Sequence, residues 1–336
     1  MDLKAYKGIL VIGEQRQGNI QNGTFELLGK AKELAAKLDC NVSVLLIGNG
    51  LNEQHGKILA KHGADNIFMT NDHSLENYST EPYTKTITKF INENKPEIVM
   101  ISATTIGRDL APRLSARLKT GLTADCTSLD IEENTQNLLM TRPAFGGNIL
   151  ATIVCPNHRP QMSTVRPGVF QKQEFDVRKP LKINCVRADI TKEDLNIEIL
   201  DTVYEKTEKK NIEEANILVS AGRGIGSKEN ITKLETLAKE LGGLVSGSRA
   251  VVDAGWIDQP SQVGQTGKTV RPDVYFACGI SGAIQHIAGM EESDLIIAIN
   301  KNPGAPIFDN ADLGIVADVN QLIPALVEEL QKETHK

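Results

Sequence analysis

Apolar and polar positions along the first half of the chain alternate between two periods. The run "GILVIG" (Gly8–Gly13) is continuously apolar and ends in glycine, which is typical of a buried parallel strand. Phe25–Leu38 then carries apolar residues at helical spacing. Further strands are predicted at Asn41–Gly48, "NIFMT" and Glu97–Ala103, and further helices at "GKILAKHGA", "YTKTITKFINENK" and Leu110–Leu118. This alternation predicts a doubly wound α/β domain.

The pattern changes from Leu122 to Phe175, where Val, Ile and Thr alternate with Gly, Pro and Asn. This composition predicts β-hairpins added to the first domain. A charged stretch, Arg187–Asn211, follows with room for one strand at "NIEILDTV", and we interpret it as the joint between domains.

A second, smaller α/β pattern begins at "NILVSAGRGIG" (Asn216–Gly226). Strands are predicted at "GLVSGSR", "VYFAC", Asp294–Asn300 and Ala311–Asp318, and helices at "NITKLETLAKELG" and "VNQLIPALVEELQK". The sequence therefore predicts two doubly wound parallel-sheet domains. We place the first at 1–190, a linker at 191–210 and the second at 211–336.

Composition narrows the function classes. The 336 residues suit about two domains. A net charge of -6, scattered basic residues and 4% aromatics argue against a nucleic-acid partner. The five cysteines form no C-x-x-C pair, which argues against zinc and iron–sulfur sites and suits reduced thiols in the cytoplasm. We expect no membrane span and no secretory signal, because no run approaches about 20 apolar residues and "MDLKAYKGILVIGEQ" lacks a signal-peptide core.

Four loops of the second domain follow predicted strands and should converge on one crevice. The first, Ser220–Gly226, is rich in glycine, which lets backbone N–H groups approach a phosphate. However, the dinucleotide fingerprint counted from Gly222 needs glycine where Ser227 stands, and the acid expected about 20 residues later is missing. An ordinary NAD site is therefore disfavoured, and a plain tight turn remains the alternative.

The second and third loops offer polar ligands for a cofactor. Arg249, in the loop Ser246–Arg249, suits either the 2′-phosphate of NADP or an electron-rich ring, and an exposed loop arginine is the simpler interpretation. The loop Asp258–Asp273 is long and lacks periodicity, as functional loops often are. Its segment Val263–Gly267 can donate hydrogen bonds to a ligand with many acceptors.

The fourth loop, "GISGAIQH", resembles the G-x-S-x-G nucleophile elbow of hydrolases. Ser281 would be the nucleophile and His286 its base. Five residues along a helix that begins at Ser281 separate the two by more than a turn, which argues against such a pair. We instead expect Ser281 and Gly282, at a helix start, to meet an anion or carbonyl, and Gln285 and His286 to donate to a ligand. A histidine satisfied in the core remains the alternative.

A longer pattern around this loop resembles the signature of the electron transfer flavoprotein α subunit. The residues that match it are Tyr275, Ala277, Gly279, Ile280, Ser281, Gly282, Ile284, Gln285, His286, Gly289, Ile296, Ala298 and Asn300. Val274 and Phe276 depart mildly from it, at positions we interpret as packing. The resemblance continues in "SAGRGIGSKEN", "SQVGQTGKTVRPDVY" and "NKNPGAPIF", and in "SATTIGRDLAPRLSARLKTGLTADC" and "RPAFGGN" of the first domain. It covers nearly the whole chain.

The resemblance implies that the second domain is a Rossmann-like FAD-binding domain. Carried over by position, Arg223 and the Ser281–Ala283 turn would hold the pyrophosphate and ribityl region, and Gly264, Gln265 and Thr266 would meet the flavin N5 edge. Arg249 would lie against the isoalloxazine ring and His286 near its C2 carbonyl. The remaining implied contacts, including those to the ribityl chain and adenosine, are Ser248, Val263, Ile284, Gln285, Asn300 and Asp318. Negative charge gathers at N1–C2=O when flavin is reduced, so a cation and a donor there stabilise it without any general base.

The resemblance also implies partners. The family works as a heterodimer with a β subunit, and it is an electron carrier rather than a stand-alone enzyme. Acyl-CoA dehydrogenases of fatty acid β-oxidation are the expected electron partners. Some relatives instead take electrons from NADH and bifurcate them to ferredoxin, through a second FAD held mainly by the β subunit. An NADP-dependent oxidoreductase and a non-catalytic nucleotide-binding module are the alternative functions.

Overall fold

The computed structural model describes residues 2–144, 149–176, 182–195, 197, 199–200 and 211–334. The described residues divide into two compact units, one made of those up to residue 200 and one of those from residue 211 onward. Most of the interpreted linker, 191–210, lies outside the described residues, as do most of the strand predicted at "NIEILDTV" and the "FGGN" of "RPAFGGN". Each unit is therefore described by itself.

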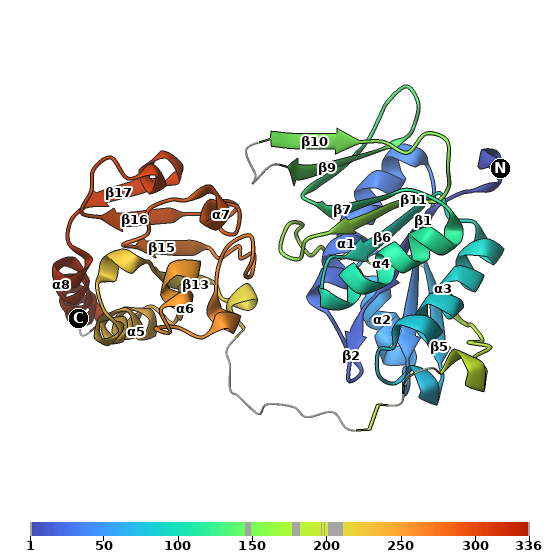
Figure 1. The fold of residues 1–336 in the computed structure, drawn as a ribbon, viewed down its shortest axis with the longest axis horizontal. Coiled ribbons are helices and arrows are strands. Elements are labelled where there is room, and N and C mark those ends of the chain that lie inside the picture. The colour runs from blue at the N-terminus through green and yellow to red at the C-terminus, as the bar shows by residue number, and fades with distance from the viewer. Residues whose placement is uncertain are drawn as a thin grey trace. The chain divides into compact units, whose positions relative to one another are not determined.

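A seven-stranded parallel sheet forms the centre of the first unit (Figure 1). Its strand order is β12-β5-β4-β1-β6-β11-β7. In chain order the strands are β1 (Ile9–Gly13), β4 (Val42–Gly48), β5 (Asn66–Asn71), β6 (Ile98–Ser102), β7 (Leu122–Cys126), β11 (Gln161–Val165) and β12 (Ile183–Cys185). β1, β6 and β11 are buried along their whole length, which explains why the sequences of β1 and β6 are almost entirely apolar.

Helices cover both faces of this sheet. Their bounds are α1 (Asn22–Leu38), α2 (Glu53–Lys61), α3 (Thr80–Asn94) and α4 (Thr105–Leu118). Ile9 and Val11 of β1 pack in one core with α1 and α2, whereas Leu10 and Ile12 pack in the other with α3 and α4. α1, α3 and α4 each end at a left-handed residue, Asp39, Lys95 and Lys119 respectively.

The predicted hairpin region is only partly a separate structure. β8 (Ser128–Ile131), β9 (Leu138–Ala144) and β10 (Ile149–Ile153) form a three-stranded antiparallel sheet. β7 and β11, from the same region, instead join the main sheet as parallel neighbours. The sequences of β7 and β11 resemble those of the hairpin strands. The two groups differ in their pairing partners, which are distant in the chain for β7 and β11. A small hairpin, β2 (Gln15–Arg16) with β3 (Asn19–Ile20), completes the strands of this unit.

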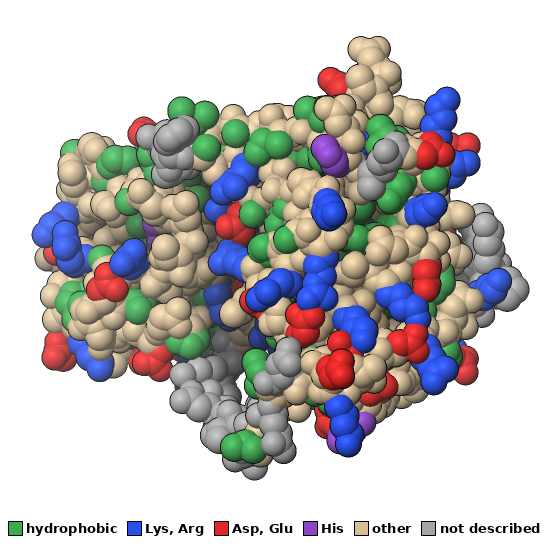
Figure 2. All heavy atoms as spheres, turned by 45° about the vertical axis from the view of Figure 1, so that its right-hand side comes forward, with side chains coloured by type: hydrophobic (Ala, Val, Ile, Leu, Met, Phe, Trp, Pro, Cys, Tyr) green, Lys and Arg blue, Asp and Glu red, His purple; other side chains and the backbone are tan. Residues whose placement is uncertain are grey.

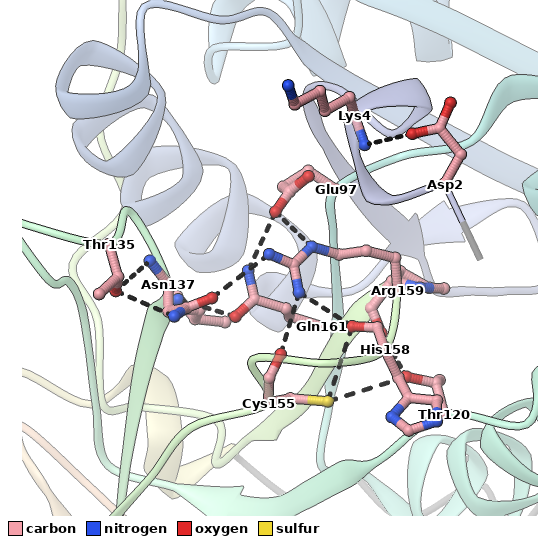
Figure 3. Close-up of polar contacts among 12 residues, drawn as sticks. Asp2, Lys4, Glu97, Thr120, Thr135, Asn137, Cys155, His158, Arg159 and Gln161 are labelled. Atoms are coloured by element: carbon pink, nitrogen blue, oxygen red, sulfur yellow. Dashed lines mark hydrogen bonds and ion pairs between the residues drawn. The ribbon is translucent and has the colours of Figure 1, made fainter.

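A buried polar cluster joins the antiparallel sheet to the main sheet (Figure 3). Arg159 Nε donates to Glu97 Oε1 at 2.5 Å, and Arg159 Nη2 donates to Asn137 Oδ1 at 3.3 Å. Gln161 Nε2 also donates to Glu97, while Gln161 Oε1 accepts from the backbone N–H of Leu138 at 2.9 Å. The Arg159 side chain is only 8% exposed, and burial raises the pKa of Glu97. The cluster therefore fixes where β9 lies relative to β6 and β11.

The second unit is built on a five-stranded parallel sheet with the order β14-β13-β15-β16-β17. Its strands are β13 (Ile217–Ala221), β14 (Leu244–Gly247), β15 (Val274–Cys278), β16 (Ile296–Asn300) and β17 (Leu313–Val316). α5 (Ile231–Glu240) and α8 (Val319–Thr334) pack together on one face. The other face is covered by the short helix α7 (Ile284–Ile287) and by the loop that contains Val263 and Val270. α6 (Arg249–Asp253) follows β14 directly.

Short 3-10 turns connect these elements. Those in the described residues are Leu3–Ala5, His73–Leu75, Lys192–Asp194, Ile212–Glu214, Arg223–Ile225, Lys228–Asn230, Gln259–Ser261 and Pro306–Asn310. The predicted fold class, an α/β protein with two parallel sheets, is confirmed.

Removing one partner of the buried ion pair should destabilise the first unit strongly. We expect Arg159→Ala to cost about 3–5 kcal/mol of unfolding free energy, because Glu97 is left buried without its cation. Urea titration of the first unit's unfolding transition measures this. The matched control is Lys57→Ala, which breaks an exposed pair with Glu53 and should cost less than about 0.5 kcal/mol. Equal costs for the two variants would contradict the structural role of the cluster.

Candidate functional site

The candidate site lies at the carboxyl end of the second unit's sheet, where the strand order reverses between β13 and β15. Open α/β sheets bind ligands at such a switch point. A cavity of about 770 Å³ opens there. All four loops chosen from the sequence contribute to its lining, together with the segment after β16. Its volume is within the usual range for cofactor sites.

Two glycine turns contact each other at the base of this cavity. Gly222 N–H donates to Cys278 O at 2.8 Å, and Gly224 N–H donates to Gly279 O at 3.0 Å. A Cβ on Gly222 would lie 2.2 Å from Gly279 O, and Gly279 has a φ of +66°. The glycines therefore serve close backbone packing. Their N–H groups are already bonded, unlike those of a dinucleotide-binding turn, so the expectation that they approach a phosphate is not met.

The turn around Ser281 differs from the expected helix start. α7 begins at Ile284, with Ala283 as its N-cap, and has only four residues. Gly282 has a φ of +89°, and a Cβ there would lie 2.2 Å from Ile307 N. The same Ile307 N–H donates to Ser281 O at 3.1 Å. Contact with a distant segment therefore holds Ser281 and Gly282 in a turn before the helix, and the prediction of a helix from Ser281 is wrong.

Backbone hydrogen bonds hold the long loop Asp258–Asp273 in place, although its sequence has no periodicity. Val263 N–H donates to Gly247 O at 2.9 Å, and Gln265 N–H donates to Gln285 O at 2.7 Å. Gln262 Nε2 donates to Thr266 Oγ1 at 2.9 Å. The segment that carries Gln265 and Thr266 is thus attached to both β14 and α7, which fixes these two side chains at the cavity wall.

Arg249 lies at the cavity beside an acid. Its Nε is 3.3 Å from Asp253 Oδ2, and its side chain is 67% exposed. Asp253 also lines the cavity. A carboxylate next to this arginine opposes a 2′-phosphate, because two anions would share one cation. The Arg249–Asp253 pair therefore suits contact with a neutral ring better than contact with the 2′-phosphate of NADP.

His286 is buried, with 6% of its surface exposed. Its Nε2 lies 2.9 Å from the hydroxyl of Tyr275, and its Nδ1 has no hydrogen-bond partner among the residues that the structure describes. Burial lowers the pKa of His286 to about 4, so the imidazole is neutral near pH 7. Since Nε2 contacts Tyr275 and Nδ1 has no partner among the described residues, neither nitrogen is hydrogen-bonded to Ser281, and the hydrolase interpretation is wrong.

Most of the sequence-derived site residues meet at this cavity. Those that line it are Arg223, Ser248, Arg249, Val263, Gly264, Gln265, Thr266, Ser281, Ala283, Gln285, His286 and Asn300. Gly282, Ile284 and Asp318 are not among its lining residues. Gly282 packs against Ile307, Ile284 is 46% exposed, and the Asp318 carboxylate accepts from the backbone N–H of Asn320 near the start of α8.

Several residues that line the cavity were not predicted from the sequence. They include Ala250, Asp253, Gln262, Asn302 and Pro306. Asp253 follows Arg249 at helical i,i+4 spacing, which is a usable signal for an ion pair. Asn302 and Pro306 belong to "NKNPGAPIF", which was noted for its resemblance without assigned roles. Gln262 belongs to "SQVGQTGKTVRPDVY", also without an assigned role, since its role depends on the fold of the loop.

The lining chemistry fits FAD. Arginines, amides and the unpartnered Nδ1 of His286 supply many hydrogen-bond positions. FAD presents phosphate and carbonyl acceptors to match them, and the glycine turns keep the wall free of side chains.

Among the described residues, no group of three or more His, Cys, Asp and Glu could hold a metal ion. No described helix is long and apolar enough to cross a membrane. On the face shown in Figure 2, Lys and Arg are interspersed with Asp and Glu.

Comparisons with known proteins agree with the site's chemistry. The chain matches the electron transfer flavoprotein domain over residues 9–192 and the electron transfer flavoprotein FAD-binding domain over residues 211–291. It is 52% identical to the electron transfer flavoprotein subunit alpha of Clostridium acetobutylicum, over 98% of this chain and 99% of that protein.

Two relatives carry other names. The acryloyl-CoA reductase electron transfer subunit beta of Anaerotignum propionicum is 43% identical, over 98% of this chain and 97% of its own length. The lactate dehydrogenase (NAD(+),ferredoxin) subunit LctC of Acetobacterium woodii is 40% identical, over 97% of this chain and 78% of its own length. The resemblance found in the sequence is therefore confirmed, FAD is the cofactor, and the chain belongs to the electron transfer flavoprotein α-subunit family.

Proposed function

We propose that the cavity between β13 and β15 holds the FAD of this electron-transfer subunit. The observation that carries the proposal is the convergence of donor side chains on one cavity of suitable size. The match to an FAD-binding domain over residues 211–291 supports it, because most of the lining residues fall in that range. The ion pair Arg249–Asp253 disfavours the NADP alternative.

Different residues of the cavity bind different parts of the cofactor. Arg223, with the turn Ser281–Ala283, binds the diphosphate and ribityl region, and Ser248, Gln285 and Asn300 donate along the ribityl chain and adenosine. Gln265 and Thr266, in the segment bonded to β14 and α7, would contact the ring edge. Arg249 would lie against the ring, and His286 would donate to it. Bound FAD accepts and passes on electrons itself, so the chain needs no nucleophile or general base.

The chain works with a β subunit, as membership of the α-subunit family implies. We place a first domain at 1–190, a linker at 191–210 and the FAD-binding domain at 211–336. The two family matches support these bounds, because one ends at residue 192 and the other begins at 211.

The electron partners follow from the relatives' chemistry. We propose an acyl-CoA dehydrogenase as the electron donor, in a setting such as fatty acid β-oxidation, and the relative named for acryloyl-CoA reductase supports an acyl-CoA enzyme. NADH and ferredoxin, through the β subunit, are a second set of partners, supported by the relative named for NAD(+) and ferredoxin. All five cysteines are free, which suits the cytoplasm.

The first test is the flavin content of the heterodimer. We expect the chain, co-expressed with its β subunit, to purify with at least one FAD per heterodimer and a flavin absorption spectrum. Extraction followed by chromatography counts the flavins, and reduction by NADH identifies the bifurcating set of partners. A flavin-free heterodimer that binds NADPH saturably would instead establish the oxidoreductase alternative. A bound adenine nucleotide without redox activity would establish the non-catalytic module.

The second test concerns Arg249. We expect Arg249→Ala to lower the flavin's first reduction potential by up to about 60 mV, a tenfold change in the equilibrium constant. The cation is lost while the Asp253 carboxylate stays beside the cavity, and solvent screening limits the effect of this exposed side chain. Spectroelectrochemical titration of the heterodimer measures the potential.

The matched control for Arg249 is Arg271→Ala. Arg271 also faces an acid, with its Nη1 4.0 Å from Glu292 Oε2, but it does not line the cavity. Its removal should leave the potential unchanged. The double variant Arg249→Ala with Asp253→Ala should recover part of the loss. A potential that Arg249→Ala does not move would contradict the placement of this cation at the ring.

A further inference from the structure

A buried polar cluster lies beneath the cavity, formed by residues of three neighbouring strands and α7. Tyr275 of β15, Ser220 of β13 and Ser246 of β14 are each fully buried. Ser220 is paired with Ser246 across β13 and β14, and with Ala277 across β13 and β15. Since side chains two residues apart share a face, Tyr275 projects on the same side as Ser220 and Ser246. That face is the one covered by α7, which carries His286.

The hydroxyls of both serines act on the Tyr275 oxygen. They favour its ionised form, although burial, the larger effect, raises the pKa of Tyr275 well above its ordinary value. Neither serine hydroxyl has a partner of normal hydrogen-bond geometry among the described residues. Tyr275 therefore keeps its own proton, and its hydroxyl contacts His286.

Two arrangements of protons are compatible with the 2.9 Å contact between Tyr275 and His286. In the first, the tyrosine O–H donates to Nε2, and the neutral ring carries its proton on Nδ1. In the second, Nε2–H donates to the tyrosine oxygen, and Nδ1 is left with a lone pair. The two arrangements differ in what His286 presents at its other nitrogen, a donor or an acceptor.

The surroundings of His286 favour the first arrangement. The Tyr275 hydroxyl is fully buried, and in the part of the chain that the structure describes it contacts His286 Nε2 at hydrogen-bond distance. If Nε2 carried the proton and donated, the buried tyrosine proton would be left without an acceptor of normal geometry, which costs free energy. Nε2 therefore accepts from the tyrosine O–H, and the proton of the neutral ring is on Nδ1, which has no partner among the described residues. The Nδ1–H donor therefore remains available at the cavity wall.

We infer that Tyr275 is a positioning residue, which holds His286 in the Nδ1–H tautomer so that the imidazole offers a hydrogen-bond donor to an acceptor atom of the ligand. The inference rests on the proposed function, because the acceptor is an atom of the bound FAD. It assigns a role to a residue that does not line the cavity itself.

The test is the tautomer of His286, read directly by NMR. The heterodimer is prepared with ¹⁵N-labelled histidine and stripped of flavin, and long-range ¹H–¹⁵N spectra are recorded near pH 7. The signals that disappear in His286→Gln identify this ring among the chain's six histidines. We expect a protonated Nδ1 and an unprotonated Nε2. A protonated Nε2 in the wild-type protein overturns the inference without recourse to any variant.

The decisive variant is Tyr275→Phe, which keeps the ring and removes the hydroxyl. We expect the single Nδ1–H tautomer to be replaced by a mixture or by Nε2–H. In flavin-loaded protein, we expect the dissociation constant for FAD to rise about three- to tenfold, as for one lost hydrogen bond. A Tyr275→Phe spectrum identical to that of the wild type overturns the role of Tyr275.

The matched control is Tyr83→Phe in the first unit. Tyr83 is also buried, and its hydroxyl donates to Leu75 O at 2.9 Å, so the variant loses a comparable bond far along the chain from His286. It should leave the His286 spectrum and the FAD affinity unchanged. The tautomer is measured without flavin, so it is independent of the flavin count. A flavin-free wild-type heterodimer would refute the proposed function alone, and a wrong tautomer would refute only this inference.

Discussion

The cavity depends on a contact between two backbones that admits no side chain. Gly222 and Gly224 on one side and Gly279 on the other bring the loops after β13 and β15 together, with hydrogen bonds of 2.8 and 3.0 Å. These loops leave adjacent strands at the point where the strand order reverses, so they would diverge if their backbones were not joined. The glycines of this contact line the cavity, together with Arg223 and Ser281.

The first unit has a comparable switch point, between β1 and β6, and a protein carboxylate lines it. The Glu14 carboxylate, just after β1, accepts from Thr104 Oγ1 at 2.5 Å at the start of α4 and pairs with Arg16. The Glu14 N–H donates to Thr24 Oγ1 at 3.0 Å in α1. A carboxylate at the start of α4 lies where an anionic ligand would be favoured. The two units therefore share a layered architecture and use its switch point differently.

Much of the fold could be predicted from the sequence because its main signals are local. Fully apolar runs such as Gly8–Gly13 mark buried parallel strands, and glycines after the strands mark the loops at the cavity. Predictions failed where contacts with distant segments determine the local structure. The pattern after Ser281 is helical, but contact with Ile307 delays the helix to Ile284. Likewise, β7 and β11 are indistinguishable from hairpin strands until their partners are known. The family resemblance supplied most of the site, whereas the role of Gln262, which donates to Thr266, required the folded loop.

The loop that carries Gln265 and Thr266 shows how little freedom this wall has. Its backbone is bonded to β14 through Val263, to α7 through Gln265, and to itself between Gly264 and Lys268. A Cβ on Gly289 would lie 2.4 Å from Gly264 N, so the helix end also presses against it. Surface loops ordinarily tolerate insertions and deletions. Here, a single added residue would move Gln265 out of register with one of its two anchors, so the length of this segment is as constrained as that of a core strand.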